Sequence, residues 1–389
     1  MNRMTAVVIA ALVAVLAVVG VLTGDTDGNG EGPIASSGPS IEVIARRVER
    51  LRRLRFDHLP RVHHVTGAQA REYGLRELDR EATPREVAAE ERLLKLLGLL
   101  PPRASLRELL GKTLTNEVGG FYDPRTGTLS VVGESSTGPL AEITLAHELT
   151  HALEDQRFGL DLPKSTGFQR DRASAAAALH EGTATIAMVD YALVKQAGTA
   201  RVPAPLRALA LKALDKATLP ESSGLPRYVR EGLVFPYAAG ARLINRIQRR
   251  GGWAAVDRVL RAKPPVSTEQ VMHPAKFEAH EAPARVSVPA PRGARLIEQG
   301  DFGEFDTGQL LLAANGRKRA TRAAAGWGGG GFALWRRGAR YAVALHWTWD
   351  SARDAAEFAR ALRRTARRLG GASVNSSGKR VELRLAPRI

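Results

Sequence analysis

The spacing of apolar residues along the chain predicts mostly helices. From residue 41 onward, apolar side chains recur every three or four positions (Ile41, Ile44, Val48), which is the period of a helix with one buried face. Thr83-Pro84 and Pro101-Pro102 mark the start and end of a second such segment. Helices with this period are predicted over residues 41–54, 86–97, 106–110, 140–158, 172–195, 205–217, 237–249 and 254–261.

The period changes to two in a few places, which predicts strands. Residues 120–123 and 128–132 flank the turn sequence Pro124-Arg125-Thr126-Gly127 and predict a β-hairpin. Near the end of the chain, alternating residues predict three strands around one helix, and the Gly-rich residues 326–331 predict a tight turn. These strands are 332–335, 341–348 and 381–385, and the helix is 351–369.

Together these elements predict an α+β fold. We expect a helix-rich domain with a small β-hairpin or sheet over residues 41–290, followed by a small C-terminal α+β domain over residues 291–389. Pro264-Pro265 and the Pro-rich stretch 283–291 lie before this boundary. No sequence repeat interrupts either part.

The N-terminal segment is predicted to be a targeting signal. Residues 5–23 carry no charged side chain, and as a helix they would measure about 28 Å, enough to cross a bilayer. Because Arg3 precedes them, we expect residues 1–23 to form a signal anchor, a transmembrane helix that leaves the rest of the chain outside the cytoplasm. A cleaved signal peptide, giving a secreted protein, is the alternative. Residues 24–40 are predicted to be a flexible linker.

Composition and charge narrow the chemistry. The formal net charge is +17, which favours anionic partners such as anionic lipid or an envelope polymer. The basic residues are not interleaved with aromatic ones, which argues against nucleic acid, and an ordinary solvated basic surface is the simplest interpretation. The chain has no cysteine, so disulfides, thiolate ligands and cysteine nucleophiles are excluded. A metal ion would have to be held by histidine and carboxylate groups.

The sequence His147-Glu148-Leu149-Thr150-His151 lies within the predicted helix 140–158. Two histidines four residues apart lie on one helix face, one turn apart, so both can hold a single metal ion. Glu148 is placed to reach a water molecule beside that ion, as a general base does. The alternative is an ordinary helix with two surface histidines.

Zinc needs a third protein ligand and an open fourth position. The scheme HExxHxxGxxH fails, because Glu154 and Arg157 occupy its Gly and last His positions. The second scheme takes a glutamate from the following helix, and Glu181 in Leu179–Ala184 is the candidate. His180 is the alternative ligand on that helix.

These motifs resemble a known class. HELTHALEDQ followed by LHEGTA is similar to the gluzincin type of zinc peptidase, and more narrowly to a group of bacterial exported or membrane-anchored metallopeptidases. A GFYDP-like hairpin before the metal helix and the segments 235–240, 267–274 and 325–329 also resemble that group, so the resemblance spans about residues 119–358. It implies a zincin-like domain and a Zn²⁺ ion held by His147, His151 and Glu181. One departure is Glu154, where the group more often has Gln; we expect this position to face outward.

Several residues are candidates for supporting roles. His273 and Tyr237 are candidate donors to the oxyanion of the transition state, and a purely structural role is the alternative for both. Asp155, Asp171 and Asp190 are candidates to orient the metal-binding side chains.

The predicted function is therefore a zinc-dependent peptidase outside the cytoplasm, with Glu148 as general base and a protein or peptide as substrate. The hairpin before the metal helix offers an edge strand that an extended peptide could pair with. The alternative is a noncatalytic envelope-associated module, with a structural or degenerate metal site and a basic surface that binds a polyanion.

Overall fold

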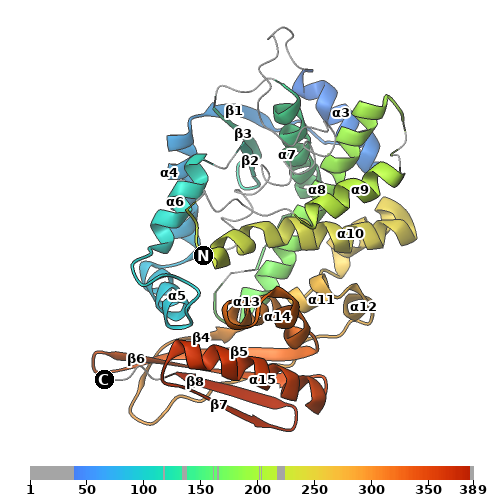
Figure 1. Cartoon of the computed structure of the whole chain (residues 1–389). Helices are drawn as coiled ribbons and strands as arrows, with labels where there is room; N and C mark the ends of the chain where they lie inside the picture. Colours follow the sequence, from blue (N-terminus) through green and yellow to red (C-terminus); the bar gives the residue numbers. More distant parts are fainter. Residues whose placement is uncertain are drawn as a thin grey trace.

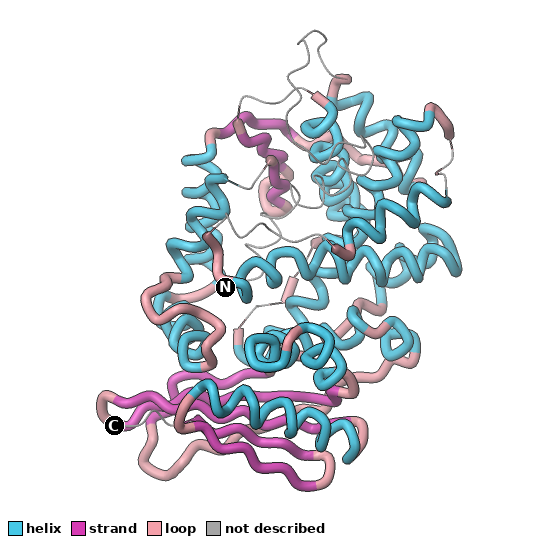
Figure 2. Tube along the Cα trace, in the orientation of Figure 1, coloured by secondary structure: helices cyan, strands magenta, loops and turns pink. Residues whose placement is uncertain are grey.

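The computed structural model describes residues 39–116, 119–133, 138–160, 162–163, 166–200, 202, 204–216 and 224–385. It has the predicted α+β fold: helices surround one small sheet, and a larger sheet with its own helices lies below them in Figures 1 and 2. The predicted anchor, residues 1–23, and nearly all of the predicted linker lie outside the described residues.

The prediction of a transmembrane helix is corrected here. Among the described residues, no helix is both long enough and apolar enough to cross a membrane. The two longest helices are α8 (Arg170–Ala197) and α10 (Arg227–Ala262).

Helices α8 and α10 form the centre of the molecule. Every residue of α8 from Ala173 to Leu193 is buried, and its many alanines let neighbouring helices approach closely. The closest approach is at two glycines: a Cβ on Gly240 of α10 would lie 1.9 Å from the carbonyl oxygen of Ala178, and one on Gly182 would lie 2.3 Å from the carbonyl carbon of Gly240. Larger side chains at either position would force the two helices apart.

Helix α10 contains both helices predicted over residues 237–249 and 254–261. The break between them is present, since Gly251 and Gly252 have non-helical dihedral angles and Gly252 has φ +64°. The remaining elements of this part are α3 (Ile41–Arg52), β1 (Arg61–Val65), α4 (Gly67–Glu81), α5 (Pro84–Leu96), α6 (Leu106–Asn116), β2 (Gly120–Asp123), β3 (Thr128–Val132), α7 (Pro139–Phe158), η1 (Gly167–Gln169), α9 (Ala204–Leu214), α11 (Thr268–Met272) and α12 (Pro274–Glu278).

The small sheet has the order β1-β3-β2. The predicted hairpin is β2 and β3, which pair antiparallel with Gly120 opposite Val131. Strand β1 was not predicted; it pairs parallel with β3, and its residues alternate poorly in polarity because it is largely exposed. Strand β2 is therefore an edge strand of the described sheet.

The C-terminal unit is a five-stranded sheet of order β4-β5-β6-β8-β7, with α15 packed on it and α13 and α14 alongside (Figure 1). The three predicted strands are present within the longer strands β5, β6 and β8, the predicted helix is α15, and β4 and β7 were not predicted. The Gly-rich residues predicted as a turn instead form most of the first half of β5, because backbone carbonyls of Ala284, Val286 and Phe302 approach them too closely for side chains. The elements are β4 (Arg295–Asp301), α13 (Glu304–Asn315), α14 (Arg317–Ala324), β5 (Trp327–Arg337), β6 (Arg340–Trp349), α15 (Ala352–Leu369), β7 (Ala372–Ser377) and β8 (Arg380–Leu385).

Candidate metal centre

Helix α7 presents the two histidines of the HExxH sequence. One face of the helix packs in a hydrophobic cluster through Ala146, Leu149 and Leu153, which fixes the rotation of the helix about its axis. His147 and His151 then lie one turn apart, on a face turned toward α8.

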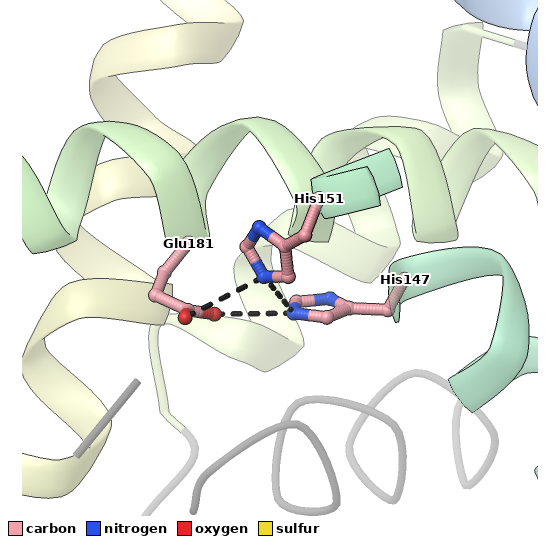
Figure 3. A group of neighbouring side chains, drawn as sticks. All are labelled: His147, His151 and Glu181. Carbon is pink, nitrogen blue, oxygen red and sulfur yellow. Dashed lines mark hydrogen bonds and ion pairs between the residues drawn. The ribbon is translucent and has the colours of Figure 1, made fainter. Parts of the chain in front are cut away.

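Three side chains from α7 and α8 converge, as Figure 3 shows. The Nε2 atom of His147 lies 3.1 Å from Oε2 of Glu181 and 3.1 Å from Nε2 of His151. The Nε2 atom of His151 lies 3.5 Å from Oε1 of Glu181. The structure thus brings together the predicted ligand set, His147, His151 and Glu181.

These distances fit a zinc ion. Tetrahedral zinc with bonds of about 2.0–2.1 Å separates its ligand atoms by about 3.3 Å, and the three measured separations lie on both sides of that value. Two imidazoles and one carboxylate, all buried, turn their lone-pair atoms toward one point. Such a group is costly to bury without a cation at its centre. Two histidines and one glutamate are among the donor sets that hold zinc in proteins.

The charges of the three residues are strongly coupled. Burial would raise the pKa of Glu181, but the charge of His151 and the hydrogen bonds of both imidazoles lower this pKa to about 2. Burial would lower the pKa of His151, but the charge of Glu181 raises it to about 9. Burial lowers the pKa of His147, which keeps this ring neutral. Without a metal ion, an imidazolium–carboxylate pair therefore balances the charge of the site.

Glu148 lies between the metal ligands and the small sheet. Its Oε2 atom accepts a hydrogen bond of 3.0 Å from the backbone N–H of Tyr122, on the edge strand β2. Burial raises the pKa of Glu148 to about 8, and a cation held by the three neighbouring residues would lower this pKa again. A Cβ on Gly120, two residues earlier on β2, would come within 3.7 Å of the Glu148 side chain. The candidate general base is thus held against the strand that the sequence predicted for peptide binding.

Tyr237 lies beside the metal ligands. Its ring stacks on the His147 imidazole, with centroids 5.9 Å apart and an interplanar angle of 23°. His151 meets the same imidazole edge-on at 4.8 Å. Within the described residues, Nδ1 of His147 is buried and has no hydrogen-bond partner, so ring packing orients this ligand in place of a hydrogen bond.

The structure places His273, the other predicted oxyanion donor, beside a carboxylate at the start of the C-terminal unit. Its Nε2 atom lies 2.8 Å from Oε1 of Glu304, at the start of α13 in the C-terminal unit. The helix before it, α11, contacts the beginning of α8, where Thr268 donates to Asp171. Asp171 precedes Glu181 by ten residues, about 15 Å along a helix. His273 therefore joins the two parts of the molecule.

The other predicted candidates are also placed outside the group of ligands. His180 is buried next to Glu181 in sequence, and burial lowers the pKa of its imidazole to about 4. Asp155 accepts hydrogen bonds from the Tyr122 hydroxyl and the Leu160 N–H, and so fixes α7 against β2. Asp190 pairs with Arg207 at 2.9 Å on the far part of α8. Asp171 accepts from the N–H and hydroxyl of Thr268.

The expectation that Glu154 faces outward is wrong. Its side chain is fully buried and lies 2.9 Å from the Arg52 guanidinium, which is itself fully buried. Arg52 also pairs with Asp257 at 3.1 Å and stacks on Trp253 at 4.0 Å. The pair joins α3, α7 and α10 behind the metal ligands. No sequence pattern indicates this pair, because Arg52 lies 102 residues before Glu154.

Comparison with known proteins assigns no activity to these residues. Residues 294–386, which make up the C-terminal unit, match a family described as a domain of unknown function (DUF8575). No curated protein and no solved structure matches the chain. The interpretation of the metal centre therefore depends on its own geometry.

Proposed function

We propose that the chain is a zinc-dependent peptidase of the gluzincin type. The observation that carries this proposal is the convergence of His147, His151 and Glu181 at 3.1–3.5 Å, with Glu148 beside them. A structural zinc site has no need of an adjacent carboxylate such as Glu148, or of an open coordination position.

Each residue has a defined part in the proposed reaction. The neutral Nε2 atoms of His147 and His151 and the carboxylate of Glu181 hold the ion. Zinc, when bound, supplies Lewis acidity that polarises a peptide carbonyl and makes water acidic near pH 7. Glu148 takes the proton of the attacking water on Oε1, since Oε2 accepts from Tyr122, and then passes it to the leaving amine.

Two further features support peptides as the substrate class. Strand β2 pairs with β3 on one side, and on its other side the Tyr122 N–H points to Glu148. An extended peptide that runs along this edge would present its carbonyl close to Glu148. Tyr237 is the remaining candidate for the oxyanion donor, since it stacks on a metal ligand.

The test compares three variants of the full chain. Zinc content is measured by mass spectrometry of purified protein, and hydrolysis is measured on a denatured, fluorescently labelled protein. We expect Glu148→Gln to keep zinc and to lose turnover by at least about 100-fold, because proton transfer contributes that much or more. His147→Ala and Glu181→Ala should lose both zinc and turnover.

Two results would contradict the proposal. Full turnover in Glu148→Gln would contradict the assignment of Glu148 as general base. Unchanged zinc content in Glu181→Ala would contradict the assignment of Glu181 as third ligand. A wild-type protein that binds zinc and cleaves no peptide would support instead the noncatalytic module with a structural metal site.

A further inference from the structure

The C-terminal unit carries most of the excess positive charge of the protein. Residues 294–386 contain 17 basic and eight acidic side chains, a net charge of +9 out of +17 for the whole chain. The cations are concentrated on α14 and α15, which lie side by side on the sheet (Figure 1). Their basic residues are Arg317, Lys318, Arg319, Arg322, Arg353, Arg360, Arg363, Arg364, Arg367 and Arg368.

Most of these cations have no acidic partner. Among the described residues, ion pairs join Arg317 to Glu231 and Arg322 to Glu357, and no ion pair is present for the other eight. Arg363 and Arg364 donate to Ser376 and Asn315, which are uncharged. The second carboxylate of α15, that of Asp354, accepts from the hydroxyl of the capping Ser351.

Some arginines elsewhere on the surface are neutralised. On α10, Arg242, Arg246 and Arg250 are about as exposed, yet Arg242 pairs with Asp215 and the other two pair with Glu278. Among the described residues, other exposed arginines, such as Arg258 on the same helix, also have no ion pair. The cations of α14 and α15 are distinguished by their number and by lying on two helices in contact with each other, and we call these ten residues the basic face.

The geometry of the basic face favours a long ligand. Arg353, Arg360, Arg363 and Arg367 follow one exposed side of α15 over about 21 Å. At its end, Arg363 and Arg367 line a hollow of about 600 Å³ whose floor is formed by Gly370, Gly371 and the start of β7. Such a row can contact several charges of a linear polymer at once, whereas a single small anion would reach one or two of them.

The choice of side chains favours phosphate groups. Nine of the ten cations are arginine, whose planar guanidinium binds phosphate oxygens in pairs. The large exposed hydrophobic side chains of the described residues lie on other elements, so the face offers neither rings for stacking on bases nor apolar groups for insertion into a bilayer. Recognition would then involve the polymer backbone alone.

We propose that the basic face of the C-terminal unit binds a linear phosphodiester polymer through its backbone, independently of the metal centre. This goes beyond the proposed peptidase function, because the binding needs neither zinc nor Glu148. It also gives the unit, whose family has no assigned function, a role in holding the protein on an anionic polymer.

The experiment measures binding of the zinc-free full chain to a labelled 20-base-pair DNA duplex, used as a phosphodiester probe, by fluorescence anisotropy. The test variant is Arg360→Gln/Arg363→Gln/Arg367→Gln. The control, Arg242→Gln/Arg246→Gln/Arg250→Gln, removes the same charge from the exposed side of α10. Circular dichroism confirms that both remain folded.

We expect the α15 variant to bind roughly 100-fold more weakly at 0.15 M salt and its log Kd to depend less steeply on log salt, by about three phosphate contacts. The α10 control should bind within about threefold of the wild type. Equal losses in both variants, or none in the α15 variant, would overturn the proposal. Equally tight binding of poly-glutamate would overturn the phosphate assignment, and binding of anionic vesicles without binding of the duplex would assign the face to a membrane surface.

Discussion

The helices around His147 and the helices of the C-terminal unit both carry many charged side chains, but these side chains differ in their burial and in their ion pairing. Around the metal centre the charges are buried and converge: His147, Glu181 and Glu154 are fully inaccessible to solvent. On α14 and α15 the cations are exposed, and among the described residues most of them have no ion pair.

The difference follows from the cost of removing charge from water. A buried charge must have a partner within the protein or a bound ion, because its desolvation costs several kcal/mol. An exposed arginine is solvated and needs no partner, so a set of unpaired ones remains available to a ligand. Buried charge in this protein therefore requires an internal partner or a bound ion, whereas exposed charge can remain unpaired in water.

Among the variants that test this comparison, the largest loss of stability is expected for the buried ion pair of Arg52 and Glu154. Arg52→Met leaves the Glu154 carboxylate buried without its cation, so we expect a loss of about 3–5 kcal/mol in the free energy of unfolding. The measurement is urea denaturation at pH 7. The matched control is Arg322→Met, which breaks an exposed pair with Glu357 and should cost under about 1 kcal/mol. Equal losses in the free energy of unfolding for the two variants would contradict the expected difference between buried and exposed ion pairs.

A smaller effect is expected at Tyr237. Because the His147 ring is held by packing, Tyr237→Ala should raise the Kd for Zn²⁺ by about 10- to 100-fold, as loss of a supporting group does in other metal sites. Tyr237→Phe keeps the ring and should keep the zinc affinity. Competition with a zinc chelator measures both. An unchanged affinity in Tyr237→Ala would show that the stacked ring does not orient the ligand.

The same pair of variants separates two roles of Tyr237. If its hydroxyl donates to the oxyanion, kcat of the zinc-loaded Tyr237→Phe protein falls by about 100-fold or more. An unchanged kcat would exclude the hydroxyl of Tyr237 as oxyanion donor and would leave its ring with a packing role only.

The smallest effect is expected at an exposed pair. The hydrogen bond and charge of Arg246 and Arg250 lower the pKa of Glu278 to about 2, from an ordinary value of 4.5. A lowered pKa means that the folded state favours the ionised carboxylate, so its contribution to stability is present above pH 4.5 and is lost as the pH falls toward 2. Glu278→Gln should therefore be slightly less stable than the wild type at pH 7. The two stabilities should converge near pH 2, as followed by urea denaturation; a difference that grows in acid would contradict this sign.

Local sequence was sufficient for the α+β class, for most of the long helices and for the group of three candidate ligands that the structure brings together. The helical period predicted α7 to within one residue at its start, and the two histidines four residues apart needed only a helix to share a face. Glu181 followed from a single glutamate at the right place in the next helix. The helix and the shared face of the two histidines depend on contacts between near neighbours in the chain, whereas the approach of Glu181 to His147 joins residues 34 positions apart.

Other features depended on contacts between distant residues. Strand β1 was not predicted, because it pairs in parallel with β3 and lies far before the β2–β3 hairpin in the sequence. Of the turn predicted at residues 326–331, only Gly326 is in a turn; the rest belongs to β5 because it pairs with β6, a contact between segments that the local sequence does not show. The contact of His273 with Glu304 was not predicted, because nothing in the sequence near His273 indicates Glu304 as its partner.

The sequence by itself determined the α+β class, the helix that carries His147-Glu148-Leu149-Thr150-His151 and the choice of Glu181. The tertiary structure decided which charges are buried, which are paired and which lie together on the basic face. The physical reason is that helix periodicity acts over a few residues, whereas desolvation depends on every atom that surrounds a group, including atoms from segments as distant as Arg52 and Glu154.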